Sequence, residues 1–369
     1  MAGPFYIDSA VGDDGNAGTS EGVGNAWQTI QKGADTVASG EICHIKASSN
    51  YVITAQIDFD TQAGTFNSPI KFFGYTTTPG DGGIIKITTS ATPVDMIDIA
   101  TAQEYVELHN IEIDATGCTS TGIDSNADQS FLDNIKVYNV LSGWAISLAG
   151  ADTSVMQHCE IHTGYGGAYT DSYVKVLYNY IHDTDHYGIQ TPANSGVVIG
   201  NIIANNAWGG LYMSGTQSLE RVSNNIIDGN ARGIQIGRAN TIGNYIVNNI
   251  ISNCTTGLAQ GLYFESSYVF GTYVLDYNAW YNNTTDITED AGVPRAIKGA
   301  NTITLTESPY TTPGSDYTLN NTAGGGADCK QIAIPAGILT ESTNISYQDT
   351  GLQAEASASA SSTTIGLIG

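Results

Sequence analysis

Apolar residues recur along the middle of the chain with a short and regular period. One column of matched positions comprises Ile113, Val137, Ile161, Ile181, Ile203, Ile227 and Ile251. A second column, in phase with the first, comprises Ile123, Ile146, Ala168, Ile189, Leu211 and Ile234. Successive members of the two columns lie 20 to 24 residues apart. Short strands and turns at this period predict a parallel β-solenoid, in which each strand pairs with its equivalent one coil later at about 4.8 Å.

Asparagines follow the same period. One file comprises Asn179, Asn201, Asn225, Asn249 and Asn278, and a second comprises Asn205, Asn230, Asn253 and Asn282. Stacked amides at a turn bond to one another and to the backbone, so both files predict asparagine ladders. The coil is too long for a left-handed hexapeptide helix. The Ile and Val columns also lack the Leu-x-x-Leu-x-Leu frame of leucine-rich repeats.

The start of the chain carries a family resemblance. FYIDSAVGDDGNAGTSEGVGNAWQTIQKGADTV, followed by GEICHIK, resembles the opening of pectate-lyase-like right-handed β-helix proteins. The resemblance covers about residues 5–280 and implies an all-β, right-handed parallel β-helix. A short helix over about 26–37 would cap the open end of the solenoid. We therefore expect a capping region (1–40), β-helix coils (41–300), and a closing segment with an assembly tail (301–369).

Composition restricts the partners of such a solenoid. The chain has 43 Gly and 21 Tyr with only 13% charged residues, as expected for a β-protein with many tight turns. The formal net charge of −24 disfavours nucleic acid and anionic membranes, and it opposes polyanionic sugars unless cations bridge them. We find no recognisable signal peptide and no stretch as long as a membrane span. The five cysteines lack paired spacing and are interpreted as small buried residues.

The densest group of candidate catalytic residues spans two coils, QHCEIHTGYGG and YNYIHDTDHYG. It comprises His162, Tyr165, His182, Asp183, Asp185 and His186. His162 and His182 each follow a matched isoleucine by one residue, so they should be neighbours across adjacent coils. Such groups could act as acid and base or hold a transition metal, and polar stacking at an exposed turn is the alternative. Polygalacturonase-like motifs are absent, and DHYGIQT departs from the order in alginate epimerases, so no roles are carried over.

Two further sets of residues are candidates for binding. The aromatic residues Trp144, Trp208, Tyr212 and Trp280 could form a platform for sugar rings, or could close the corners of the coils. The acidic loop with Asp8, Asp13, Asp14 and Asn16 offers oxygen ligands for Ca²⁺, although its spacing is not that of an EF-hand. A solvated turn is the alternative for this loop.

The repeat ends before the last part of the chain. There, DYTLNNTAGGG and YQDTG resemble a closing segment of β-helix proteins from phage and environmental bacteria. From Glu355 onward Ala and Ser alternate, and such a sequence is expected to order only against a partner surface.

These features favour a virion-type structural or receptor-binding protein, similar to a phage head fibre or tailspike, that binds surface glycans or another particle protein. We expect a homotrimer on a virion or outside the cell, and not an enzyme. Two alternatives stay open. One is a polysaccharide lyase, epimerase or hydrolase with its groove on the side of the β-helix, and the other is a bacterial surface adhesin.

Overall fold

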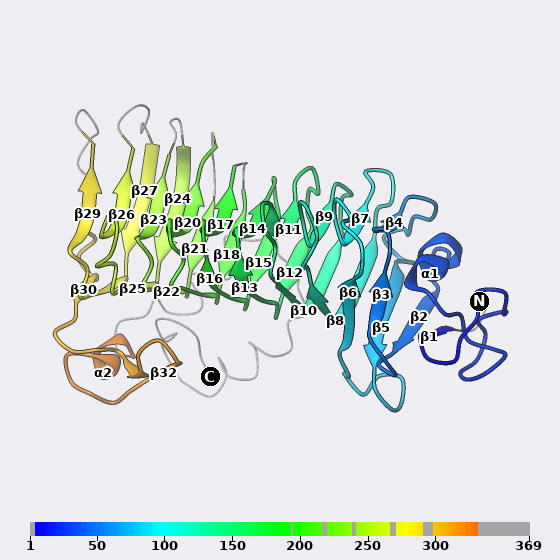
Figure 1. The fold of residues 1–369 in the computed structure, drawn as a ribbon. Helices are drawn as coiled ribbons and strands as arrows, with labels where there is room; N and C mark the ends of the chain where they lie inside the picture. The colour runs from blue at the N-terminus through cyan, green and yellow to red at the C-terminus, as the bar shows by residue number, and fades with distance from the viewer. Residues whose placement is uncertain are drawn as a thin grey trace.

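The computed structural model describes residues 4–192, 195–215, 220–237, 241–265, 271–290 and 298–330. Its strands follow one another as stacked coils along a single axis (Figure 1). Every pairing between coils is parallel, which confirms the all-β parallel solenoid predicted from the repeat. The segment from Glu355 onward lies outside the described residues.

Each coil contributes strands to two sheets. Among the described residues the larger sheet has 20 strands. They are β1 (Phe5–Asp8), β2 (Ile42–Lys46), β3 (Tyr51–Ile53), β5 (Ile70–Tyr75), β6 (Ile85–Thr89), β8 (Val106–Asp114), β10 (Phe131–Tyr138), β12 (Val155–Gln157), β13 (Glu160–Gly164), β15 (Lys175–Leu177), β16 (Tyr180–Thr184), β18 (Val197–Ile199), β19 (Ile202–Ala204), β21 (Arg221–Ser223), β22 (Ile226–Asp228), β24 (Thr241–Val247), β25 (Ile250–Ser252), β27 (Gly271–Asp276), β28 (Ala279–Tyr281) and β30 (Ile303–Thr304).

The smaller of the two sheets has ten strands within the described ranges. They are β4 (Ile57–Phe59), β7 (Ile97–Ile99), β9 (Ile123–Ser125), β11 (Trp144–Leu148), β14 (Gly166–Thr170), β17 (Tyr187–Thr191), β20 (Gly209–Met213), β23 (Arg232–Ile236), β26 (Gln260–Phe264) and β29 (Thr285–Glu289). A separate antiparallel hairpin consists of β31 (Tyr310–Thr312) and β32 (Asp316–Leu319).

The two apolar columns form the core between the sheets. Ile113 pairs with Val137, and the pairing continues in register through every predicted member to Ile251. The second column is likewise in register from Ile123 to Ile234. All members of both columns are buried, so each coil adds its apolar side chains to one continuous core.

The first asparagine file is a buried ladder, as predicted. Asn201 Oδ1 accepts hydrogen bonds from the backbone N–H and the side-chain amide of Asn179, both at 2.9 Å. The same pair of bonds repeats in each coil down to Asn278. Each amide therefore joins its own coil to the next, and the backbone groups at this corner are satisfied without water.

The predicted second file is wrong by one residue at most of its positions. The inner ladder runs from Thr184 through Asn206 to Asn230. Asn205, Asn253 and Asn282 instead have φ values between 48° and 55° and lie on the outside of the same turn. Asparagine tolerates this left-handed conformation well, so these side chains set the turn. The predicted bond between coils is confirmed for one outer pair, since Asn282 Nδ2 donates to Asn253 Oδ1 at 2.9 Å.

Helix α1 (Ile30–Thr36) lies at the N-terminal end of the solenoid, inside the range predicted for a helix (Figure 1). Thr29 caps its first turn, with Oγ1 accepting from Lys32 N at 3.1 Å. Ile30, Gly33 and Ala34 form its buried face. A Cβ at Gly33 would come within 2.9 Å of Ile7 Cδ1 and 3.0 Å of the Phe72 ring, so glycine allows α1 to pack closely on the first coils.

The closing segment, residues 303–330, covers part of the outer face of the larger sheet. It contains β30, the β31–β32 hairpin and helix α2 (Gly326–Cys329). Its apolar residues form a second cluster with outward side chains of four coils, namely Ala204, Ile226, Ile250 and Ala279 with Leu305, Tyr310, Tyr317, Leu319 and Cys329. Neither described helix is long and apolar enough to cross a membrane.

Candidate functional site

The six candidate catalytic residues do not form one site. His162 and His182 are neighbours in the larger sheet, as predicted, with ring centroids 5.3 Å apart. Tyr165 and His186 also stack, with centroids 4.9 Å apart, but next to the ten-stranded sheet. Asp185 lies between β16 and β17, where the chain turns from one sheet to the other. The turn between the two sheets therefore divides the cluster into two pairs of rings.

The pair on the larger sheet belongs to a ladder of stacked side chains. His162 stacks on Tyr138, with centroids 5.0 Å apart, and His182 stacks on Tyr180. His182 Nδ1 lies 2.7 Å from a carboxylate oxygen of Asp183. Burial lowers the pKa of His162, so its ring is neutral at pH 7. The side chain of His182 is only 14% exposed, and Tyr180 also contacts the ring of Tyr317 in the closing segment, so this ladder is partly covered.

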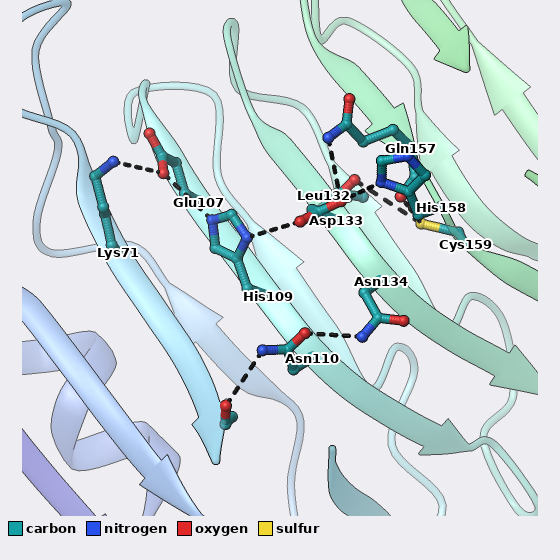
Figure 2. A network of polar contacts seen from close by, with 11 residues as sticks. Lys71, Glu107, His109, Asn110, Leu132, Asp133, Asn134, Gln157, His158 and Cys159 are labelled. Carbon is teal, nitrogen blue, oxygen red and sulfur yellow. Dashed lines mark hydrogen bonds and ion pairs between the residues drawn. The ribbon is translucent and has the colours of Figure 1, made fainter. Parts of the chain in front are cut away.

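A second row of polar side chains crosses the larger sheet nearer the N-terminus (Figure 2). Glu107 Oε2 lies 2.9 Å from Lys71 Nζ and 3.3 Å from His109 Nε2. Asp133 lies 3.3 Å from the other nitrogen of His109 and 2.8 Å from His158 Nδ1. Opposite charges thus alternate along neighbouring strands.

The charges of this row stabilise one another. Burial alone would lower the pKa of His109, but its hydrogen bonds with Asp133 and Glu107 outweigh burial and raise it. Burial opposes ionisation of Asp133 as well, yet its bonds with His109 and His158 bring its pKa below the usual range. Both carboxylates of the row, Glu107 and Asp133, are already paired. We interpret the row as a structural ion network.

A hollow bordered by some of the predicted residues lies on the ten-stranded sheet. We call it the groove; it has a volume of about 550 Å³, within the roughly 300–1,000 Å³ of small-molecule sites. Its lining comprises His186, Tyr187, Ala207, Trp208, Tyr212, Ala231, Arg232, Gln235, Gly257, Leu258 and Glu265. Another cavity, of about 470 Å³ beside α1, is lined without any charged side chain.

A ring stack leads into the groove from one side. It consists of Tyr165, His186 and Trp208, one residue from each of three successive coils. The centroids of His186 and Trp208 are 4.2 Å apart, and Trp144 meets the His186 ring edge-on at 5.6 Å. Burial lowers the pKa of His186, which keeps its ring neutral. Trp208 remains 56% exposed, so the last ring of the stack is open to a ligand.

The floor of the groove is polar and ordered. Tyr212 and Gln235 are paired outward residues of β20 and β23. Gln235 Oε1 accepts a hydrogen bond from Tyr187 Oη at 2.6 Å, and Gln235 Nε2 donates to Glu265. Tyr187 stacks on Tyr212 with centroids 4.7 Å apart, and burial raises its pKa to about 12, so its hydroxyl is a stable donor.

Arg232 is fixed at the edge of this floor. Its Nε donates to Gln260 Oε1 at 3.0 Å, and its guanidinium lies 4.1 Å from the ring centroid of Tyr263. Tyr263 in turn donates to Asp290 at 2.8 Å. These contacts hold the arginine in one orientation, so that the floor presents fixed donors and acceptors.

Two of the four predicted aromatic residues, Trp208 and Tyr212, line the groove, and Trp144 contacts the His186 ring at its edge. Trp144, Trp208 and Tyr212 all face the same side of the ten-stranded sheet. Trp280 is an exception, because it pairs with Ile251 in the inward column and is fully buried. Tyr187 and Arg232 were not among the predicted binding residues, although each lies two residues before a matched column position.

A comparison with known families agrees with this architecture. Residues 121–293 match the family described as right handed beta helix region. The matched residues cover slightly less than half of the chain, and the match agrees with the β-helix fold of the structure. A search of curated protein sequences found no match.

Solved β-helix structures resemble the chain over most of its length. A rhamnogalacturonan lyase matches with a TM-score of 0.64 and 12% identity, over 84% of this chain and 91% of its own. The pectate lyase Pel9A matches with a TM-score of 0.55 and 12% identity, over 98% and 96%. A lacto-N-biosidase from Eubacterium ramulus matches with a TM-score of 0.50 and 11% identity, over 81% and 67%. At these identities the comparisons show the fold of the β-helix and nothing of its chemistry.

The predicted Ca²⁺ loop of the β-helix has another role in the structure. Asp14 accepts hydrogen bonds from the backbone of Gln28 and Thr29, and so supports the start of α1. Asp8 accepts from Ser48 at 2.6 Å, and Asp13 accepts from its own turn. The Asn16 amide donates to a backbone carbonyl. The four side chains therefore do not converge, and the described residues contain no group of three acidic, His or Cys residues placed to hold a metal.

Proposed function

We propose that this β-helix is a glycan-binding protein and that the groove on its ten-stranded sheet is the binding site. The exposed ring of Trp208, at the end of the ring stack, carries this proposal. Pyranose rings present apolar C–H faces that pack on aromatic rings, while their hydroxyls need fixed donors and acceptors. The groove combines both, because Glu265 and Arg232 line it together with Trp208.

The other polar surfaces suit a ligand less well. On the larger sheet, His162 and His182 are stacked face to face with their neighbours, so few ring faces remain open there. In the row of Figure 2, the carboxylates are neutralised by Lys71 and the two histidines. The groove, in contrast, offers an open ring beside ordered polar groups.

A binding screen tests the proposal directly. The wild-type chain is applied to an array of bacterial surface glycans and plant polysaccharides, together with Trp208→Ala and Phe66→Ala. Phe66 is 78% exposed and distant in sequence from the groove, so it controls for loss of an exposed ring. Trp208→Ala should weaken the strongest signal at least ten-fold, and Phe66→Ala should leave it unchanged. Equal binding by both variants, or no binding by the wild type, would contradict the proposal.

We further propose that the glycan-binding β-helix acts as a virion-type receptor-binding or structural protein, assembled as a homotrimer. Two observations support a place on a virion. The closing segment resembles those of phage β-helix proteins. The net charge of −24 favours a protein that stays soluble in a crowded assembly. Light scattering on the purified chain should give three times the mass of one chain. A monomer would instead favour a bacterial adhesin or an enzyme.

A polysaccharide-processing enzyme is the second candidate, favoured by one contact. The imidazole of His182 is held by Asp183 at 2.7 Å, an arrangement that suits acid–base chemistry. Uronate polymers incubated with and without Ca²⁺ would give new ultraviolet absorbance if the chain is a lyase. Turnover that disappears in His182→Ala would establish this second function and displace the first.

A further inference from the structure

We infer that the groove binds one neutral pyranose ring in a slot beside Ala231, where the sugar continues the ring stack as its next member. This inference rests on the proposed glycan-binding function and specifies its ligand class and binding geometry. It follows from the register of the coils, from the walls of the groove, and from the charges around it.

The ring stack ends at a position where the next coil has no ring. Tyr165, His186, Trp208 and Ala231 each lie three residues before the inward column members Ala168, Ile189, Leu211 and Ile234. Those four column members pair in register from coil to coil. Ala231 therefore occupies the place that an aromatic ring occupies in the three preceding coils.

The replacement of a ring by a methyl group leaves a gap about as thick as one coil. Coils repeat at about 4.8 Å, and the rings of the stack are 4.9 and 4.2 Å apart, so each ring fills the space of one coil. A methyl group in place of a ring leaves space beside Trp208 at the outer edge of this coil, where Ala231, itself only 5% exposed, borders the groove. A pyranose ring packs on an aromatic ring at a similar separation.

The following coil supplies the opposite wall of the slot. Gly257 packs against Ala231 from the next coil, since a Cβ on Gly257 would lie 3.0 Å from the Ala231 methyl group. Leu258 follows it, lines the same groove and is 54% exposed. A sugar between Trp208 and Leu258 would thus have an apolar surface on each of its two faces.

The geometry also sets the direction of the glycan. The stacking direction of the rings coincides with the direction from coil to coil, so their planes lie across the solenoid axis. The glycosidic bonds of a pyranose leave from the edge of its ring. The glycan chain would therefore cross the ten-stranded sheet and place a single residue in the slot, instead of running along the axis.

The surrounding charges favour a neutral sugar. Glu265 lines the groove and Asp290 lies behind Tyr263, whereas Arg232 is the one cation in the lining and already contacts Gln260 and Tyr263. The chain as a whole carries a net charge of −24. A uronate carboxylate would meet more negative than positive charge, so hydroxyls are the better partners for this floor.

Titrations with simple glycosides test the slot. The probes are methyl β-glucopyranoside, methyl β-galactopyranoside, methyl N-acetyl-β-glucosaminide and galacturonic acid, followed by saturation-transfer NMR and tryptophan fluorescence. Ala231→Phe should fill the slot and abolish the transfer signal. Leu258→Ala removes one exposed wall without entering the core and should weaken binding about three-fold or more. Phe66→Ala, an equivalent loss of an exposed apolar side chain, should change nothing.

The outcomes separate this inference from the function on which it depends. If Trp208→Ala loses binding while Ala231→Phe and Leu258→Ala bind as the wild type does, glycans use another face of Trp208 and the slot is wrong. Should Ala231→Phe fail to fold, the result for Leu258→Ala decides the question. Stronger binding of galacturonic acid than of the neutral glycosides would overturn the ligand class. Absence of binding by every probe and by the glycan array would remove the proposed function itself.

Discussion

The buried asparagine ladder gives the sharpest prediction about stability. The side chain of Asn225 is fully buried and makes four hydrogen bonds. It donates to Val198 O and to Asn249 Oδ1, and it accepts from the backbone and side-chain amides of Asn201. Asn225→Leu keeps the approximate volume and removes all four bonds. At about 1 kcal/mol net for each bond, the loss is about 4 kcal/mol, and the buried groups left unpaired can only add to it.

A solenoid should register this loss in a characteristic way. Its stability is close to a sum over coils and their interfaces, so weakening one interface in the middle uncouples the two halves. Urea unfolding of Asn225→Leu, followed by circular dichroism, should show a lower first midpoint and a second, separate transition. Hydrogen exchange should accelerate most in β21 and β22, the strands on either side of residue 225.

Asn205→Gly is the matched control for this experiment. Asn205 lies in a turn with φ of 55° and is exposed, so glycine can adopt its conformation without strain. Its free energy of unfolding should stay within about 1 kcal/mol of the wild type. If Asn225→Leu behaves like this control, the ladder does not couple the coils and the reasoning is refuted.

Three further predictions concern pH, thiols and the closing segment. Burial and repulsion from Asp124 raise the pKa of Asp98 from 3.8 to about 6. The folded protein therefore gains stability from protonated Asp98 below about pH 4, and it loses this stability as the pH rises through 6. Asp98→Asn should therefore raise the free energy of unfolding at pH 8 by about 1 kcal/mol after screening, and with it the melting temperature, and should leave both unchanged at pH 4. All five cysteines are buried, and burial raises the pKa of Cys159 to about 12; the native chain should not react with Ellman's reagent at pH 8, whereas the urea-unfolded chain should. Tyr310→Phe removes the buried 2.7 Å bond to Ser252, costs about 1 kcal/mol, and should speed proteolysis of the closing segment; unchanged cleavage would contradict its docking role.

Periodicity in the sequence was sufficient for the fold because each coil repeats the same inward side chains. The Ile and Val columns and the first asparagine file therefore appear in the structure in the register that counting gave. The second asparagine file was misplaced because two adjacent asparagines, such as Asn205 and Asn206, differ only in backbone conformation, which spacing does not reveal.

The candidate site was predicted less completely, for geometric reasons. Only three residues separate His182 from His186, yet the chain turns between two sheets over that distance and sends the two rings to different faces. Trp280 was misassigned because a large aromatic residue can replace isoleucine in the inward column. The pairing of His109 with Asp133 joins neighbouring strands, and neither residue stands out in the sequence without that register.

A crystal structure of the chain soaked with the best-binding oligosaccharide would test the central claim most directly. We predict one sugar ring stacked on Trp208 beside Ala231, with Leu258 against its other face and its hydroxyls bonded to Glu265 or Arg232. A bound sugar on the larger sheet beside His162 and His182, with the groove empty, would contradict the account.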